Sequence, residues 1–173
     1  MIKIISGKYK GKNLASLSTK VVRPTQARIK KSLLEILGPY DGKSVLDLFS
    51  GIGTIGIEML SRGAKSLTCV EKDRRVFKIL LENLKNICYN DEVEVFCSDY
   101  KKYLNKQKMK KFDIIFADPP YYGFDYKEIF ASSKLLLKEG GTFCMEMKRQ
   151  DIDEIFVIKK YGNTQLIFWS KDE

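Results

Sequence analysis

Four consecutive residues carry the most specific chemical signal of this sequence, Asp118-Pro119-Pro120-Tyr121. Each proline fixes its own φ angle and lacks an N–H donor, so beside the Asp118 carboxylate the chain forms a corner that only accepts hydrogen bonds. The amino group of a nucleobase is a poor nucleophile because its lone pair is delocalised into the ring. Accepting both of its N–H bonds, at the Asp118 side chain and the Pro119 carbonyl, draws the nitrogen toward sp³ geometry and frees that lone pair.

Tyr121 adds an aromatic platform to this corner. Stacking on an aromatic ring contributes about 1–3 kcal/mol per base, so Tyr121 can hold a base that has been rotated out of its helix. Tyr122 is a candidate for a second platform. The alternative interpretation of the four residues is a rigid turn after a buried strand.

A glycine-rich loop is the second signal, Gly51-Ile52-Gly53-Thr54-Ile55-Gly56. It follows the apolar run 45–49 and precedes an amphipathic helical pattern, which is the layout of a nucleotide-cradling loop in an α/β sheet. Gly51 and Gly53 lack a Cβ, so the backbone can turn sharply and lie against a ligand. The spacing fits a nicotinamide site as well as a methyl-donor site, so the loop alone does not decide between them.

Three further acids follow predicted strands. Glu71 closes an apolar run, where a carboxylate can accept both hydroxyls of a ribose; otherwise it is an ordinary exposed acid. Asp99 either accepts the adenine amino group or caps a helix. Asp47 either faces the ammonium of a methionine moiety or organises the loop, and an acid inside an apolar strand requires a partner. With the acceptor corner, these acids predict an S-adenosylmethionine (SAM) site beside an amine-methylating site.

The composition narrows the chemistry. The chain has no histidine, which removes Ser-His and Cys-His pairs and the usual general base. Four cysteines without a CxxC pair make a zinc site improbable, so we expect no metal. Cys69, Cys97 and Cys144 lie in apolar runs and are predicted to be core residues, which favours a reduced, cytoplasmic location. No apolar run approaches the roughly 20 residues of a membrane span.

Positive charge is concentrated at the start of the chain. The formal net charge is +9, and residues 1–43 hold ten Lys or Arg against two Asp or Glu. This segment is either a solvated basic tail or a phosphate-contacting surface, and we favour the surface because the segment looks folded. Glycines around residues 8–10 predict a hairpin with projecting lysines. Tyr9 either packs against the protein or stacks on a base, and we favour packing. The candidate RNA-binding residues are Lys8, Lys10, Arg23, Thr25 and Arg28.

The elements that must position these residues alternate along the chain. Thr25 is predicted to be the N-cap of a first helix, whose apolar face is Ile29, Leu33, Ile36 and Leu37. Strands are predicted over 44–49, 67–71, 93–97, 113–117, 142–147, 155–159 and 164–170. Helices are predicted over 55–62, 74–87 and 127–137, whereas 101–111 is expected to be a helix end and a solvated loop.

This order predicts an α/β, Rossmann-like fold with a seven-stranded, mostly parallel sheet and an antiparallel last strand. A small N-terminal β-hairpin and helix precede it. We expect residues 1–43 to form a basic appendage of the single domain 44–173, and the protein to be a monomer. Ligands of such sheets bind beyond the carboxyl ends of the strands, which gathers the glycine loop, Glu71, Asp99 and the acceptor corner at one edge.

Beyond the glycine loop and the acceptor corner, three short segments carry a family resemblance: Arg23-Pro24-Thr25, Leu60-Ser61-Arg62-Gly63-Ala64 and Tyr161-Gly162-Asn163-Thr164. Over nearly its whole length the chain resembles the RsmD-type 16S ribosomal RNA guanine-N2 methyltransferases, which have the class I SAM-dependent fold. The resemblance implies catalysis at Asp118, Pro119, Pro120 and Tyr121. It implies SAM binding at Asp47, Gly51, Gly53, Glu71 and Asp99.

The same resemblance implies a substrate and a place for the basic segment. The substrate is one guanine of small-subunit ribosomal RNA, presented on an assembled or assembling particle, and Arg23-Pro24-Thr25 is expected near the mouth of the cofactor site. Ala27 and Lys31 stand where the family more often has acids, and Ser50 and Ile52 replace a more usual Ala and Ser. Because Ala27 and Lys31 lie in the first predicted helix, the contacts that this helix makes with substrate or cofactor are left open.

Three alternative functions stay open. The first is an amine methyltransferase acting on another RNA or on DNA adenine, although DNA enzymes of that kind usually carry a separate recognition domain for which this chain has no room. The second is a nicotinamide-dependent oxidoreductase. The acceptor corner and the basic segment favour methyl transfer over this alternative. The third is a non-catalytic RNA-binding protein that kept the fold.

Overall fold

The computed structural model describes residues 2–16, 24–107 and 109–172, and of Pro24 and Thr25 it describes only the backbone. Arg23 and the side chain of Thr25, two of the predicted RNA contacts, therefore lie outside the described residues.

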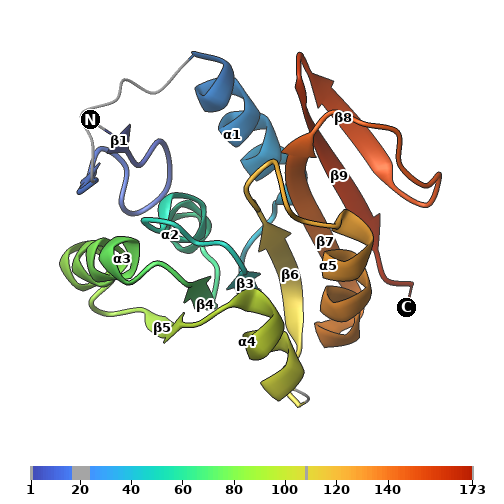
Figure 1. The fold of residues 1–173 in the computed structure, drawn as a ribbon. Coiled ribbons are helices and arrows are strands. Elements are labelled where there is room, and N and C mark those ends of the chain that lie inside the picture. The colour runs from blue at the N-terminus through green and yellow to red at the C-terminus, as the bar shows by residue number, and fades with distance from the viewer. Residues whose placement is uncertain (1, 17–23, 108, 173) are drawn as a thin grey trace.

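One sheet of seven strands forms the centre of the molecule, in the order β5-β4-β3-β6-β7-β9-β8 (Figure 1). The five strands from β5 to β7 pair in parallel, and β9 is antiparallel to both of its neighbours. The strands are β3 (Ser44–Asp47), β4 (Ser66–Glu71), β5 (Glu92–Cys97), β6 (Phe112–Ala117), β7 (Leu137–Lys148), β8 (Val157–Tyr161) and β9 (Thr164–Ser170). The predicted Rossmann-like α/β sheet with an antiparallel last strand is confirmed.

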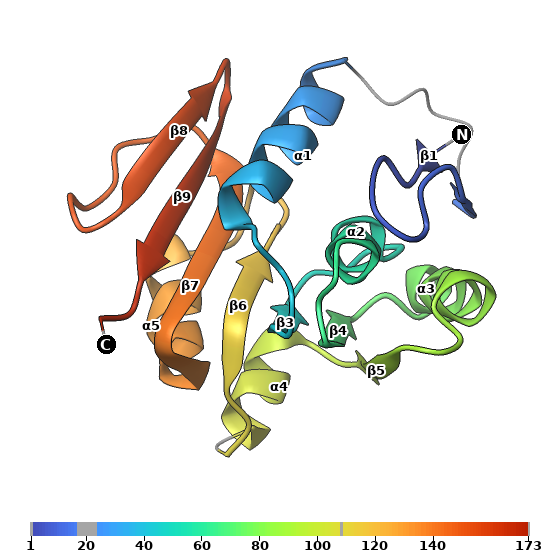
Figure 2. The same ribbon diagram turned by 180° about the vertical axis from the view of Figure 1, so that it is seen from behind.

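Helices cover both faces of the sheet. As Figures 1 and 2 show from opposite sides, α1 (Pro24–Leu37), α2 (Thr54–Ser61) and α3 (Arg74–Ile87) lie on one face, and α4 (Tyr100–Lys106) and α5 (Tyr126–Ser133) on the other. Successive side chains of a strand point to opposite faces. In β3, accordingly, Val45 packs into the core beneath α1–α3 and Leu46 into the core beneath α4 and α5.

A small antiparallel hairpin precedes the sheet, as predicted. Its strands are β1 (Ile2–Lys3) and β2 (Asn13–Leu14), and Ile4 and Leu14 anchor it in the core. The N–H of Lys8 donates to the Ser61 carbonyl at 2.8 Å and the N–H of Tyr9 to the Ser61 hydroxyl at 2.9 Å. The hairpin is therefore fixed to the end of α2.

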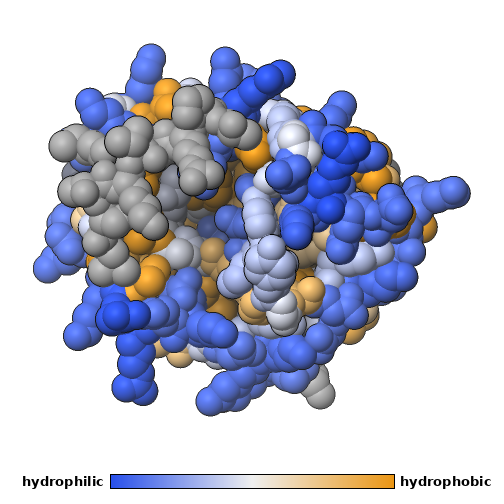
Figure 3. Space-filling model, turned by 45° about the horizontal axis from the view of Figure 1, so that its top comes forward, coloured by the Kyte–Doolittle hydropathy of each residue, from blue (hydrophilic) through white to orange (hydrophobic). Residues whose placement is uncertain are grey.

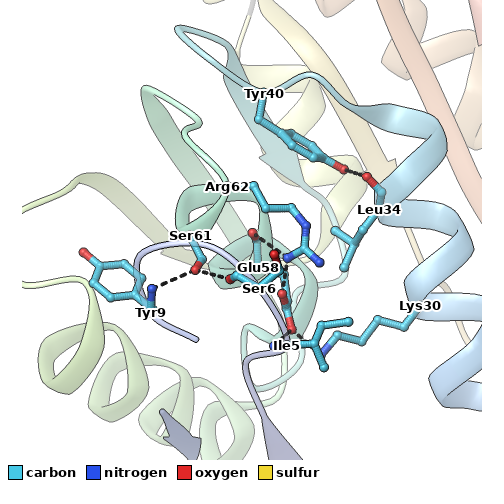
Figure 4. A network of polar contacts seen from close by, with 9 residues as sticks. All are labelled: Ile5, Ser6, Tyr9, Lys30, Leu34, Tyr40, Glu58, Ser61 and Arg62. Atoms are coloured by element: carbon cyan, nitrogen blue, oxygen red, sulfur yellow. Dashed lines mark hydrogen bonds and ion pairs between the residues drawn. The ribbon is translucent and has the colours of Figure 1, made fainter. Parts of the chain in front are cut away.

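Glu58 joins three elements at one buried point (Figure 4). Its side chain is fully buried in α2 and accepts the backbone N–H of Ile5 from the hairpin at 2.7 Å. Lys30 of α1 lies 2.8 Å from the same carboxylate, and Arg62 pairs with its other oxygen. A buried charge needs such partners, so Glu58 ties the hairpin and α1 to the helix that begins at the glycine loop.

The structure corrects some of the sequence predictions. Thr25 lies inside α1 and not at its N-cap, since the helix already includes Pro24, a residue suited to the first turn. Ile36 is exposed, unlike Ile29, Leu33 and Leu37 on the same helix. Cys97 is also exposed, because it ends β5 at the edge of the sheet, whereas Cys69 and Cys144 lie in central strands and are buried as predicted.

Candidate functional site

A cleft of about 440 Å³ opens at the carboxyl ends of β3, β4 and β6. Seven of the predicted site residues line it: Gly51, Glu71, Asp99, Asp118, Pro119, Pro120 and Tyr121. Figure 3 turns this end toward the viewer and shows a recess with hydrophobic residues inside and hydrophilic residues around it. Segments separated by almost 70 residues in the sequence thus face one space, as the parallel sheet requires.

The glycine loop turns sharply where the sequence requires it. Gly53 lies at the N-cap of α2 with φ of 91°, and a Cβ there would lie 2.7 Å from Leu80. Gly51 has φ of 54°, but a Cβ there would meet no atom within 4 Å. Gly53 is therefore needed for packing beneath the loop, whereas Gly51 leaves open space on the side of the cleft.

Glu71 holds the glycine loop in place. Its two carboxylate oxygens accept the N–H of Gly51 at 3.0 Å and the N–H of Asp73 at 2.7 Å. Asp99 is the N-cap of α4 and accepts the N–H of Lys101 at 2.9 Å, so the helix-cap interpretation is correct. Both acids also line the cleft, and their predicted contacts with ribose and adenine stay predictions.

Asp47 lies beneath the loop rather than in the cleft wall. It is buried, and its Oδ1 has no hydrogen-bond partner among the described residues. Burial raises the pKa of the Asp47 carboxyl to about 7, although the N–H groups of Phe49 and Gly56 favour its charged form. A buried, incompletely partnered carboxylate under a ligand loop favours a positively charged ligand above it.

Asp118 stands at the acceptor corner with two other carboxyls nearby. Asp118 is exposed to the cleft, and the protein around its carboxyl raises its pKa well above the usual range, mainly through lost hydration. Glu146 and Asp47 raise the pKa of Asp118 further by charge repulsion. Burial also raises the pKa of Glu146, which lines the same cleft. This acidic floor suits a ligand with a sulfonium and an ammonium group.

The ring of Tyr121 is accessible from the cleft at the acceptor corner. Its side chain is 45% exposed, and its hydroxyl lies 2.7 Å from the hydroxyl of Thr164 at the start of β9. Tyr122 is 76% exposed, with the ammonium of Lys148 over its ring at 5.1 Å. The hydrogen bond to Thr164 fixes the Tyr121 ring, which is how a stacking platform keeps its orientation.

Other lining residues escaped the sequence analysis. The rings of Phe49, Tyr100 and Phe124 pack against one another with centroids 5.0–5.9 Å apart and form one wall of the cleft. Glu146 did leave a signal, because it is an acid inside the apolar run 143–147. Phe124 left none, since an aromatic residue in a loop is more often a packing residue. The cleft is also lined by Gln26, Leu48, Val70, Lys72 and Ser98.

Three of the predicted RNA-binding residues, Lys8, Lys10 and Arg28, lie on the part of the N-terminal segment that the structure describes. Lys8 forms an ion pair with Asp91, and the Tyr9 hydroxyl donates to the same carboxylate, so Tyr9 packs against the protein as expected. Lys10 and Arg28 are exposed. None of these three basic residues lines the cleft, and their contact with RNA stays a prediction.

Two negative findings concern the part of the chain that the structure describes. It contains no group of three or more His, Cys, Asp or Glu side chains arranged to hold a metal ion. None of its helices is both long enough and apolar enough to cross a membrane.

Comparisons with known proteins agree with this geometry. The family model described as conserved hypothetical protein 95 matches residues 2–170. Ribosomal RNA small subunit methyltransferase D of Buchnera aphidicola from Acyrthosiphon pisum is 36% identical, over 87% of this chain and 81% of its own length. The solved structure of yhhF, a candidate methyltransferase of Escherichia coli, superimposes with a TM-score of 0.85 at 26% identity, covering 99% of this chain and 98% of that one.

A more distant structure shares the fold. The 16S rRNA N2 G1207 methyltransferase of Thermus thermophilus, solved with AdoMet and guanosine, gives a TM-score of 0.69 at 24% identity. The match covers 90% of this chain and 45% of that one.

Proposed function

The chain belongs to the family described as conserved hypothetical protein 95, and from that premise we propose that it is a SAM-dependent methyltransferase of small-subunit ribosomal RNA. We propose further that the methyl group goes to the exocyclic N2 amine of one guanine. The observation that carries this proposal is a single cleft in which an acceptor-only corner, Asp118 to Tyr121, faces a glycine loop and an acidic floor.

The residues present fit SAM as the methyl donor. Asp47 and Glu146 lie near Asp118, and a cationic ligand with sulfonium and ammonium groups would favour the ionised, negatively charged forms of these carboxyls. Open space at Gly51 lets a ligand approach the loop backbone, and Glu71 keeps that backbone in place. SAM supplies an electrophilic methyl group when it is bound.

This chain's own residues then act on the base. Tyr121 stacks on the extruded guanine, and the Asp118 carboxylate and the Pro119 carbonyl accept the two N–H bonds of its N2 amine. The amine nitrogen is thereby held in line for attack, so the rate enhancement comes from positioning and fixed charge. A raised pKa makes the Asp118 carboxylate a better proton acceptor, and it takes the proton that the amine loses on methylation.

The partners follow from the same proposal. The RNA is presented in an assembled or assembling small ribosomal subunit, and the enzyme acts as a cytoplasmic monomer. Lys10 and Arg28 contribute positive charge outside the cleft, and Lys8 contributes less because Asp91 already neutralises it.

The test is methyl transfer from radiolabelled SAM to small subunits that lack the modification and to bare 16S ribosomal RNA, followed by nucleoside analysis. We expect N2-methylguanosine, formed faster on the particle than on bare RNA. Methylation of adenine or of another guanine atom would overturn the assignment of the amine. Failure to transfer a methyl group to either substrate would overturn the assignment of rRNA.

A further inference from the structure

A second hollow, of about 370 Å³, lies between the end of β7 and the turn that joins β8 to β9. It is lined by Lys148, Arg149, Gln150, Asp151, Lys160 and Asn163. Three of these residues are cations and one is an acid, which leaves a local excess of two positive charges. The turn belongs to the segment Tyr161-Gly162-Asn163-Thr164, whose last residue bonds to Tyr121 at the acceptor corner.

This hollow adjoins the acceptor corner. Lys148 and Gln150 line a narrow recess of about 40 Å³ together with Pro119, Pro120 and Tyr121. Lys148 and Gln150 also line the hollow, so the recess and the hollow share these two residues. A strand of nucleic acid whose base enters the corner therefore has its sugar and phosphates within reach of the hollow.

The cations of the hollow are not neutralised by the protein. Neither Lys148, Arg149 nor Lys160 forms an ion pair with any residue in the described ranges. In contrast, Lys8 and Lys30 of the N-terminal segment are paired with Asp91 and Glu58. Uncompensated cations around a concave surface create a positive potential that attracts anions.

Hydrogen bonds hold the hollow and the corner in a fixed relation. The N–H of Arg149 donates to the Asn163 carbonyl at 2.8 Å, and the Gln165 amide donates to the Gln150 carbonyl at 3.0 Å. The bond between Tyr121 and Thr164 joins the start of β9 to the corner itself. A site that is already arranged loses less entropy when its ligand binds.

We propose that this hollow binds the RNA backbone and takes the phosphodiester groups next to the nucleotide whose base enters the acceptor corner. The proposal rests on the proposed function, because it assumes an RNA substrate at that corner. Phosphate contacts fix the register of a nucleic acid without reading its sequence. The hollow thus positions the target nucleotide, and the corner selects its amine.

The test compares two double variants in binding to unmodified small ribosomal subunits over a range of salt concentrations. Arg149→Ala/Lys160→Ala removes two cations of the hollow and leaves Lys148, which contacts Tyr122. Lys102→Ala/Lys159→Ala is the control with the same charge loss; both lysines are exposed and neither lines the hollow. Lys159 neighbours Lys160 on β8, so its side chain points to the other face of the strand.

We expect the hollow variant to lower the steepness of log K against log[salt] by about 1.4, since each phosphate contact on a single strand contributes roughly 0.7. Its affinity for SAM should be unchanged, and the control variant should behave as the wild-type protein does. If the two variants have equal salt slopes while the wild-type protein still transfers methyl groups, the phosphate-site proposal falls and the proposed function stands. If the wild-type protein binds no subunits, both proposals fall.

A free phosphate ion presents the same chemistry as a phosphodiester. Titration of the complex with inorganic phosphate and with chloride at matched ionic strength separates the two ligands. We expect equal loss of binding in both salts and no binding of millimolar phosphate to the free protein. Phosphate that binds the free protein at millimolar concentration, yet displaces the subunits no better than chloride does, would show a separate site for a small anion and would contradict the backbone assignment.

Discussion

Tyr121 has two separable features, a ring at the cleft and a hydroxyl bonded to Thr164. Tyr121→Phe keeps the ring and loses only the hydrogen bond, whereas Tyr121→Ala loses the platform. Because stacking contributes about 1–3 kcal/mol per base, we expect Tyr121→Ala to reduce kcat/KM for RNA by about 5- to 150-fold and Tyr121→Phe by much less. Steady-state kinetics on small subunits measures both, and equal losses would show that the hydroxyl and not the ring matters.

Asp118 predicts an unusual pH dependence. Asp118 can act only as an acceptor of an amine N–H bond, beside the Pro119 carbonyl, when its carboxyl is ionised. Its pKa in the free enzyme is raised by lost hydration and by Glu146 and Asp47. We therefore expect kcat/KM to fall with decreasing pH at a value well above the roughly pH 4 of an ordinary aspartate. A bound sulfonium favours the ionised form, so the corresponding fall in kcat should lie at lower pH.

Glu146→Gln provides the control for this pH dependence. It removes one nearby carboxyl, so the acid limb of kcat/KM should move to lower pH while the corner stays intact. Acid limbs near pH 4 for both the wild-type protein and the variant would contradict the electrostatic description of the corner.

Single residues were predictable from sequence where their chemistry is unusual in its context. The Asp-Pro-Pro-Tyr corner and Glu71 stood out by type and by place, and both line the cleft. What the sequence could not show is that Glu71 already bonds the N–H of Gly51, because that contact depends on how two strand ends meet. Phe124 was invisible for the same reason, as it becomes a wall residue only through packing on Phe49 and Tyr100.

At the scale of elements, the strand-to-helix turn makes two glycines differ. Gly51→Ala and Gly53→Ala both place a side chain at positive φ, at a cost of about 1–2 kcal/mol. Gly53→Ala also pushes its Cβ against Leu80, so we expect it to lower the free energy of unfolding by a further 1–3 kcal/mol or so. Gly51→Ala adds no such clash and should mainly weaken SAM binding. Denaturant unfolding and SAM titration measure the two effects, and the reverse ranking in stability would contradict this description of the loop.

Glu58 lets the contact between α2 and the N-terminal elements be tested. Glu58→Gln leaves Lys30 and Arg62 without their buried carboxylate, and breaking a buried ion pair costs about 3–5 kcal/mol. We expect a loss of that order in denaturant unfolding. The matched control is Glu35→Gln, which breaks an exposed pair with Lys31 one helical turn away and should change stability little. Comparable losses would mean that Glu58 is not a junction.

The succession of elements was predictable because apolar periodicity repeats with each strand and helix. Residues 101–111 were expected to be a helix end and a solvated loop, and the structure has the helix α4 over Tyr100–Lys106. The lysines of this segment conceal an apolar helix face of Tyr103 and Leu104. The junction at Glu58 was also not predictable. Arg62 is one helical turn from Glu58, but the partners Ile5 and Lys30 come from separate segments that only the folded chain brings to Glu58.

For the whole molecule, counting charge along the sequence indicated the basic start of the chain and nothing else. Residues 44–173 hold 21 basic and 20 acidic residues, which predicts no basic surface there. Folding nevertheless gathers Lys148, Arg149 and Lys160 beside the acceptor corner, while Lys8 is neutralised by Asp91. The distribution of charge over the folded surface thus differs from its distribution along the sequence. The division of the chain at residue 43 stays a prediction.

The central claim is that a corner able only to accept hydrogen bonds makes a guanine amine reactive. The most direct measurement is single-turnover methyl transfer by the wild-type protein and by Asp118→Asn, on the same small subunits with SAM binding verified for each. Because the asparagine amide cannot take the amine proton and presents a donor, we expect the rate to fall by about 10²–10⁴-fold with SAM affinity retained. A rate within a few-fold of the wild-type value would contradict the account.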